Sequence, residues 1–428
     1  MRLPVTLRVY SILLVSSVLI LRGLIDLATH FLAGPSASRI LSDLNFILCG
    51  GRHLDTPYKS CPGPDAVTGF IYPPPAAFYA HWVGLWGLQT GFAIQTVISV
   101  VVLALTVRAL IRLAPPEGNA ARWAVVLGCL AIAPVSMSFV TGHLNFIMLA
   151  SFVLPLTLMG KRRSAAAGVW IAAGFWLKLY SIMLLPLLLA ERRNWRAAGA
   201  GILALLIIPL ILLPWLPLHL YHDFFFERMP PLQRMTAPGI AQSIAPVLLY
   251  IQQSATTLTI NFKDCVLTPG MQLLIRAIMA AALVLALGQQ RAMRGKAVLE
   301  PVAMLLGGIL LYAPLAWGYH YVLAMPLVWL GLTRLLRADC GWVRGALILY
   351  AWAALLLPSW MSVPGPLTPS ALLYLPFITR YPVALILLMG IVIDSRRVEW
   401  GMLWHDVRRE GVKTLSAGLF GPPAQSAP

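Results

Sequence analysis

The sequence predicts an all-α integral membrane protein with about 12 membrane segments, and three observations support this. Of the 428 residues, 59% are hydrophobic and only 11% are charged, whereas soluble domains carry about 25% charged residues. Apolar runs near the roughly 20 residues that cross a bilayer recur along the chain. Lys and Arg lie between these runs, where they set the orientation of the helices. The net charge of +17 therefore does not indicate a nucleic-acid partner.

The first apolar run, residues 8–32, follows Arg2 and Arg8 and resembles the start of a signal peptide. Because no convincing small-residue cleavage site follows, we interpret it as a retained helix that leaves the cytoplasm. A long, Pro-rich outer loop is expected at 34–88, with short helices at the membrane interface.

The next three runs alternate in direction across the membrane. They occupy 90–112, 122–140 and 145–159, and the last one ends at the basic stretch 161–163. Basic residues mark the cytoplasmic side of a membrane protein, so this stretch anchors the topology.

Residues 164–190 are too long for one comfortable helix, and Lys178 lies near their middle. A single helix would place 191–196 and later basic clusters outside. Two short helices with a turn near Lys178 would instead make every basic cluster cytoplasmic. Such pairs occur where they pack in protein or line a wet cavity. We choose the pair, which places Lys178 inside the protein on the outer side.

The remaining segments follow in order, and both chain ends are then cytoplasmic. We expect one transmembrane domain over 1–395 in the cell inner membrane, with a second long outer loop at 219–269. Residues 396–428 are expected to be a basic cytoplasmic tail that is partly disordered. The remaining segments are 197–218, 271–289, 298–316, 321–336, 344–358 and 372–394.

Five cysteines leave the redox state open. Cys49 and Cys61 share the first outer loop, where a disulfide could persist, and two unpaired thiols are the alternative. No Cys-x-x-Cys or Cys/His spacing indicates a metal site.

Polar side chains that are costly in lipid gather on the outer face under this topology, and such convergence suggests a site. Each has a structural alternative: Asp43 could cap a helix and Lys178 could extend to the lipid headgroups. His143 could cap the next span, and His320 could be an interfacial residue. Asp26, in the first span, ranks below Asp43. The converging residues are Asp43, His143, Asn145, Lys178, Gln242 and His320.

A further group, His219, His222 and Asp223, resembles a metal cluster in the second outer loop. The polarity of an interfacial loop explains these residues as well, so no metal is expected.

Several short motifs occur in an order that resembles one known family. The first outer loop contains Ser-Asp-Leu-Asn-Phe at 42–46, Gly-Gly-Arg at 50–52, Leu-Asp-Thr-Pro-Tyr at 54–58 and Tyr-Pro-Pro at 72–74. This loop resembles that of glycosyltransferase family 87, whose members resemble polyprenyl-phosphate-mannose-dependent mannosyltransferases and have the GT-C fold.

The resemblance continues along residues 10–395. Residues 142–145 resemble the family's Gly-Gln-x-Asn element, and 168–180 its Gly…Lys-x-x-Pro helix pair. Residues 241–243 resemble its Asn-Gln-Ser, and 316–320 its Ser-Trp-x-x-His. The chain departs from these patterns at His143, Ser181 and Ala241, near the expected donor.

The resemblance implies a membrane hexosyltransferase, with mannose as the family default. It would transfer the sugar, with inversion at the anomeric carbon, from a polyprenyl-phosphate-sugar donor to an extracytoplasmic glycolipid or glycan of the cell envelope. Asp43 would be the general base, and Lys178, His320 and Gln242 would bind the donor phosphate. No Asp-x-Asp motif is present, so neither a metal-dependent nucleotide-sugar site nor a cofactor is expected. The possible substrate contacts are His143, Asn145, Tyr72 and Trp317.

Two other classes share the span count. A transporter or flippase would also use buried Asp, Lys and His, although its polar residues would favour the midplane. A lipid-linked glycan ligase or polymerase usually carries its large outer loop late in the chain. Here the long outer loops are early and central.

Overall fold

The computed structural model describes residues 4–33, 42–61, 69–161, 163–234, 242–249, 266–292, 299–358 and 375–394. Helices are the only regular secondary-structure elements in these ranges, which confirms the all-α prediction. The predicted tail at 396–428 and parts of both predicted outer loops lie outside the described residues.

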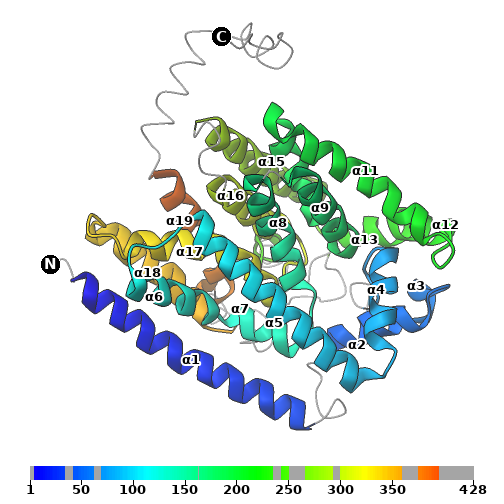
Figure 1. Cartoon of the computed structure of the whole chain (residues 1–428), viewed down its shortest axis with the longest axis horizontal. Helices are drawn as coiled ribbons and strands as arrows, with labels where there is room; N and C mark the ends of the chain where they lie inside the picture. Colours follow the sequence, from blue (N-terminus) through cyan, green and yellow to red (C-terminus); the bar gives the residue numbers. More distant parts are fainter. Residues whose placement is uncertain are drawn as a thin grey trace, which may run out of the picture.

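The helices pack into one bundle with a cluster of short helices at one end (Figure 1). In chain order they are α1 (Val5–Ala33), α2 (Ser42–Arg52), α3 (Pro57–Ser60), α4 (Pro74–Gly84), α5 (Leu88–Leu113), α6 (Asn119–Leu130), α7 (Ala133–Val140), α8 (Asn145–Gly160), α9 (Ser164–Lys178), η3 (Tyr180–Met183), α10 (Leu184–Leu189), η4 (Arg192–Asn194), α11 (Trp195–Leu212), α12 (Leu218–His222), η5 (Asp223–Arg228), α13 (Met229–Arg234), α15 (Pro269–Ala292), α16 (Leu299–Tyr312), η6 (Gly318–Ala324), α17 (Met325–Leu335), α18 (Trp342–Leu356) and α19 (Leu375–Asp394).

Four described helices are long and apolar enough to cross a membrane alone. They are Val5–Thr29, Leu88–Leu113, Arg192–Leu212 and Pro269–Arg291, and the pair α6–α7, bent by 51°, would make a fifth. Other apolar helices hold 10–17 residues, too few to span a flat bilayer unless neighbouring protein surrounds them. The chain is thus a helical membrane protein. Every predicted segment contains a helix, but the number that cross stays a prediction.

The turn predicted near Lys178 is present. Helix α9 ends at Lys178, and Leu179 has a φ of 46°, a left-handed conformation that a residue with a Cβ seldom adopts. The chain then continues as η3 and α10, so residues 164–190 do not form one helix.

Helices α9 and α11 lie side by side and run in the same direction. A Cβ on Gly168 would lie 2.2 Å from the Ala197 carbonyl oxygen, so the backbones touch there. Eight residues further along α9, the Trp176 indole donates a 3.1 Å hydrogen bond to the Leu205 carbonyl of α11. Two consecutive parallel helices need a returning segment between them, and η3–α10 is that segment. This geometry agrees with the prediction of two short helices over residues 164–190. The face of the membrane on which each turn lies stays a prediction.

The short helices α2, α3 and α4 form a layer with α12 (Figure 1) and η5, and its core also includes residues of α5 and α8. Its core contains Leu48, Phe70 and Phe224, all about 1% exposed or less. The Cys49–Cys61 pair is disulfide-bonded, with Cα atoms 5.8 Å apart, and so ties α2 to the end of α3. This resolves the choice that the cysteine count had left open.

The opposite end of the bundle is basic. Arg8, near the start of α1, donates a 2.7 Å hydrogen bond to the Leu335 carbonyl at the end of α17. The Trp329 indole of α17 bonds the Ala114 carbonyl at the end of α5 at 2.8 Å. The start of α1 and the ends of α5 and α17 therefore lie close together.

Candidate active site

A partly open cavity of about 300 Å³ lies between the short-helix layer and the bundle. Its walls come from α2, the α7–α8 turn, the end of α9, η3, η5 and the segment that leads into η6. Most of the wall is aromatic or aliphatic, as is usual for a ligand pocket. Six of the eight sequence-predicted site residues line it: Asp43, Tyr72, His143, Lys178, Trp317 and His320.

Lys178 is held in place by neighbours on α8 and the turn before it. Its Nζ donates a 2.8 Å hydrogen bond to Asn145 Oδ1 and lies 3.3 and 3.4 Å from Nδ1 and Nε2 of His143. The amide of Asn145 donates in turn to the Tyr319 carbonyl at 3.0 Å. Because Lys178 is the last residue of α9, the break after it lets the ammonium group reach the cavity.

His143 joins this group to the first outer loop. Its Nε2 lies 2.8 Å from the Tyr72 hydroxyl, and both side chains are buried. The preceding residue, Gly142, has a φ of 65°, and a Cβ there would come within 3.0 Å of Leu44 of α2. Glycine therefore lets the α7–α8 turn approach α2 and bring His143 to the cavity.

Asp43 lies in the first turn of α2 and its side chain reaches the same cavity. Burial raises the pKa of its carboxyl to about 6, against the opposing effects of a hydrogen bond with the Tyr319 side chain and the charge of Lys178. An acid with a pKa near neutrality can accept a proton at physiological pH and release it again, which suits a general base.

His320 and Trp317 present hydrogen-bond donors with no partner. The Trp317 backbone N–H donates to His320 Nδ1 at 3.0 Å, so the neutral ring carries its proton on Nε2. That Nε2 and the Trp317 indole Nε1 are both buried and find no partner among the described residues. Buried donors left unpaired are costly. They suit a ligand with acceptor oxygens.

Comparison with protein-family models gives one result: the model of glycosyltransferase family 87 matches residues 70–316. The chain belongs to glycosyltransferase family 87. It is therefore a membrane glycosyltransferase, which uses a sugar donor and an acceptor, and the transporter alternative is set aside. The matched range contains Tyr72, His143 and Lys178 but begins after Asp43 and ends before Trp317. No curated protein matches the chain.

The other two predicted residues of this family-87 enzyme do not line the cavity. Asn145 acts on it through Lys178, as described above. Gln242 is buried, its backbone N–H donates to the Ala316 carbonyl at 2.7 Å, and its carbonyl accepts from the Tyr321 hydroxyl. These bonds fasten Gln242 to η6 and to the segment before it. A contact between the Gln242 side chain and the donor stays a prediction.

Sequence reasoning missed several cavity residues of the glycosyltransferase. Tyr319 lines the cavity and its side chain hydrogen-bonds Asp43, but it was not among the predicted site residues. Phe224 and Phe225 belong to η5, a π-helical turn, and form part of the apolar wall. π-Turns occur often at functional sites, but the only sequence signal was the run of three phenylalanines at 224–226.

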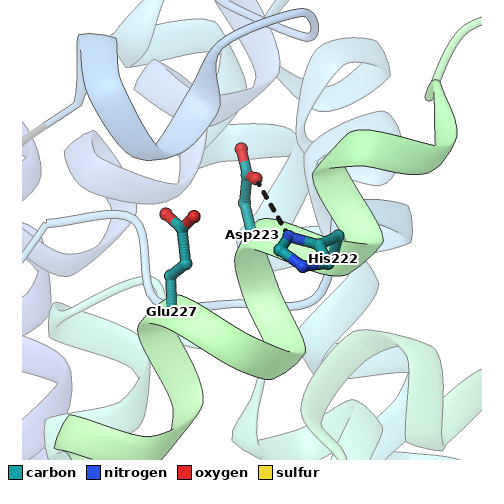
Figure 2. A group of neighbouring side chains, drawn as sticks. All are labelled: His222, Asp223 and Glu227. Atoms are coloured by element: carbon teal, nitrogen blue, oxygen red, sulfur yellow. Dashed lines mark ion pairs between the residues drawn. The ribbon is translucent and has the colours of Figure 1, made fainter.

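The metal-like group differs from its sequence-based description. Figure 2 shows His222, Asp223 and Glu227 together on one helical segment, with ligand atoms within 4.8 Å of one another. His219 is not among them; its Nε2 lies 3.4 Å from the Asp55 carbonyl oxygen. His222 and Glu227 are exposed and none of the three lines the cavity, so the group carries no assigned role in the glycosyltransferase.

Proposed function

We propose that this glycosyltransferase transfers a hexose, with mannose as the family default, from a polyprenyl-phosphate-sugar donor to a glycan or glycolipid acceptor outside the cytoplasm. The proposal includes the GT-C fold and a place in the cell inner membrane. One observation carries it: Asp43, Lys178 and the two unpartnered donors of Trp317 and His320 face a single, mostly apolar cavity.

The cationic side of the cavity suits a lipid phosphate. Breaking the bond between the sugar C1 and the phosphate oxygen leaves the bonding electrons on the phosphate. Lys178 and the Nε2–H of His320 would stabilise that charge, and preorganised donors of this kind are usually the largest contribution to such a reaction. The indole N–H of Trp317 is a third donor.

The apolar walls suit the isoprenoid part of the same donor. Phe175, Ile182 and Met183 line the cavity from α9 and η3, and Phe225 and Met229 line it from the η5 side. A nucleotide-sugar would place a charged diphosphate and a base against these side chains, whereas a polyprenyl chain would bury apolar surface there.

Asp43 is the proposed base. It would take the proton of the acceptor hydroxyl as that oxygen bonds to C1, and polyprenyl phosphate would leave with the electrons of the broken bond. Among the described residues that line the cavity, Asp43 is the one carboxylate. A retaining double displacement needs a second carboxylate as nucleophile, so a single displacement with inversion is favoured.

The test is turnover by the purified full-length protein in detergent. Polyprenyl phosphates that carry mannose, glucose, galactose or arabinose are supplied with envelope glycolipid extract, and released polyprenyl phosphate is quantified. We expect polyprenyl phosphate to be released only when the extract is present and Asp43 is intact. The NMR signal of the anomeric proton should show inverted configuration at C1. Consumption of nucleotide-sugars in place of lipid-linked sugars, or retention at C1, would refute the proposal. Envelope glycolipids of a deletion strain identify the acceptor.

A further inference from the structure

A second hollow lies at the basic end of the molecule, far from the proposed active site. It has a volume of about 590 Å³ and opens between the start of α18 and the end of α19. Counted along η6 and α17, it is separated from His320 by roughly 25 Å, close to the thickness of a bilayer core. With the orientation expected from the sequence, the two sites would belong to opposite leaflets.

Part of the wall of this hollow is apolar and exposed. Val343 and Leu347 of α18 and Ile386 of α19 line it and are all exposed. Gly390 also lines it, and a Cβ there would meet no atom within 4 Å, so this glycine leaves a groove between the two helices. Trp342, 71% exposed at the first turn of α18, has the location of an interfacial aromatic anchor.

Positive charge gathers at the mouth of the groove. Arg344 lines it, and Arg334 donates a 2.8 Å hydrogen bond to the Ile391 carbonyl of the opposite wall. Asp339 also lines the groove, and its carboxylate is paired with Arg337 at 3.3 Å, with both side chains exposed.

We propose that the α18–α19 groove binds an anionic phospholipid of the leaflet opposite the active site. The phosphate would lie at Arg344 beneath the Trp342 ring, and an acyl chain would follow Val343, Leu347 and Ile386 past Gly390. An arginine at the mouth of an apolar groove matches a phosphate joined to an acyl chain, and basic pockets between membrane helices bind anionic headgroups. The inference is independent of the sugar donor proposed above.

The experiment measures which phospholipids the full-length protein retains. Purified protein in detergent is incubated with equimolar dioleoyl phosphatidylglycerol and dioleoyl phosphatidylcholine, re-isolated, and its bound lipids are quantified by mass spectrometry. We expect phosphatidylglycerol to be enriched. Arg344→Gln should lower the enrichment by about fivefold, the contribution of one cation near an anionic surface, and Arg344→Lys should retain most of it. Arg112→Gln is the matched control, because Arg112 is exposed at the end of α5 and does not line the groove.

A second variant tests the groove without changing charge. Gly390→Phe fills the space where an acyl chain would lie, and should lower total bound lipid. Gly199→Phe, on α11 where a Cβ also meets no atom within 4 Å, should leave bound lipid unchanged. Equal retention of the two lipids by the wild-type protein, wild-type enrichment in Arg344→Gln, or wild-type total bound lipid in Gly390→Phe would each overturn the proposal.

Discussion

At the scale of single residues, the site depends on a few polar groups whose neighbours set their properties. Asp43 is ordinary in sequence, but burial raises the pKa of its carboxyl to about 6. Lys178 is costly in an apolar setting, and Asn145 and His143 surround its ammonium group. The chemistry therefore follows from placement as much as from residue type.

Asp43→Asn should lower turnover by about 10²–10⁴-fold, because the amide keeps the shape of the side chain but cannot take the acceptor proton. Donor binding should persist, since a neutral amide does not repel the lipid phosphate. Both are measured with purified protein, by polyprenyl phosphate release and by donor titration. If Asp43 only caps α2, Asn would cap the helix equally well and turnover by the variant would be close to that of the wild type.

The same residue predicts a pH profile. The raised pKa means that Asp43 binds a proton as the pH falls through about 6, and a protonated carboxyl cannot act as a base. We therefore expect kcat/KM to fall about tenfold per pH unit below that value and to be flat above it. A profile flat down to pH 5 would exclude Asp43 as the base.

Lys178→Ala should weaken donor affinity and turnover together, because the ammonium charge meets the phosphate in both the ground state and the transition state. Lys161→Ala is the control, since Lys161 is exposed at the C-terminal end of α8, opposite the end at Asn145 that contacts Lys178. Donor titration and initial rates give the two effects separately. Unchanged donor affinity in Lys178→Ala would remove the lysine from the phosphate site.

At the scale of elements, close backbone approaches and one covalent bond position the site. Helix α9 can deliver Lys178 only because it packs directly on α11 at Gly168, and α2 can deliver Asp43 only because its layer is held together. Each of these contacts predicts a stability change.

Gly168→Ala should destabilise the protein by about 1–3 kcal/mol, the usual cost of overpacking, because the new Cβ would meet backbone atoms of α11 at 2.2 and 2.5 Å. Gly199→Ala, on α11 itself, adds a Cβ in open space and should be neutral or stabilising by up to about 1 kcal/mol. Thermal unfolding in detergent measures both. Equal melting of the two variants would contradict the close packing.

The Cys49→Ser/Cys61→Ser variant should be less stable by about 2–3 kcal/mol, because the disulfide limits the freedom of the unfolded chain. Reduced wild type should melt like the variant. Free thiol counting on oxidised protein checks the bond directly. If the oxidised wild type and the double variant melt at the same temperature, the bond contributes nothing.

At the scale of the whole molecule, the distribution of charge predicts one orientation in the membrane. Arginines gather at one end of the bundle, near Arg8 and Arg334, whereas the proposed active site lies at the other. Basic ends of membrane proteins face the cytoplasm, so the cavity is expected to open outward, where polyprenyl-linked sugars would meet a periplasmic acceptor.

This orientation is testable with single cysteines at the two ends of α11. Arg193→Cys should react with an impermeant maleimide only after the membrane is permeabilised, whereas His219→Cys should react from outside; both positions are exposed. Cys265 is replaced by Ser, and the two buried free cysteines, Cys129 and Cys340, serve as unreactive internal controls. Labelling of Arg193→Cys in intact cells would show that this end of α11 faces outward and that the predicted topology is wrong.

Composition and hydrophobic period alone determined that the chain is a helical membrane protein, because a bilayer admits few alternatives to apolar helices. The positions of the basic clusters favoured the break at Lys178, since a turn there keeps all of them on one side of the membrane. Motif order indicated the family, which the match over 70–316 then showed.

Only the tertiary structure decided which side chains share the cavity. Tyr72, His143 and His320 are far apart in the chain, and the packing of α2 on the α7–α8 turn and of α8 on η6 brings them together. It also brought in Tyr319 and Phe224, and left Gln242 behind the wall, because the direction of a side chain depends on helix rotation and neighbouring contacts. Sequence spacing specifies the period of a helix, whereas the face that meets a cavity is set by contacts between elements distant in the chain.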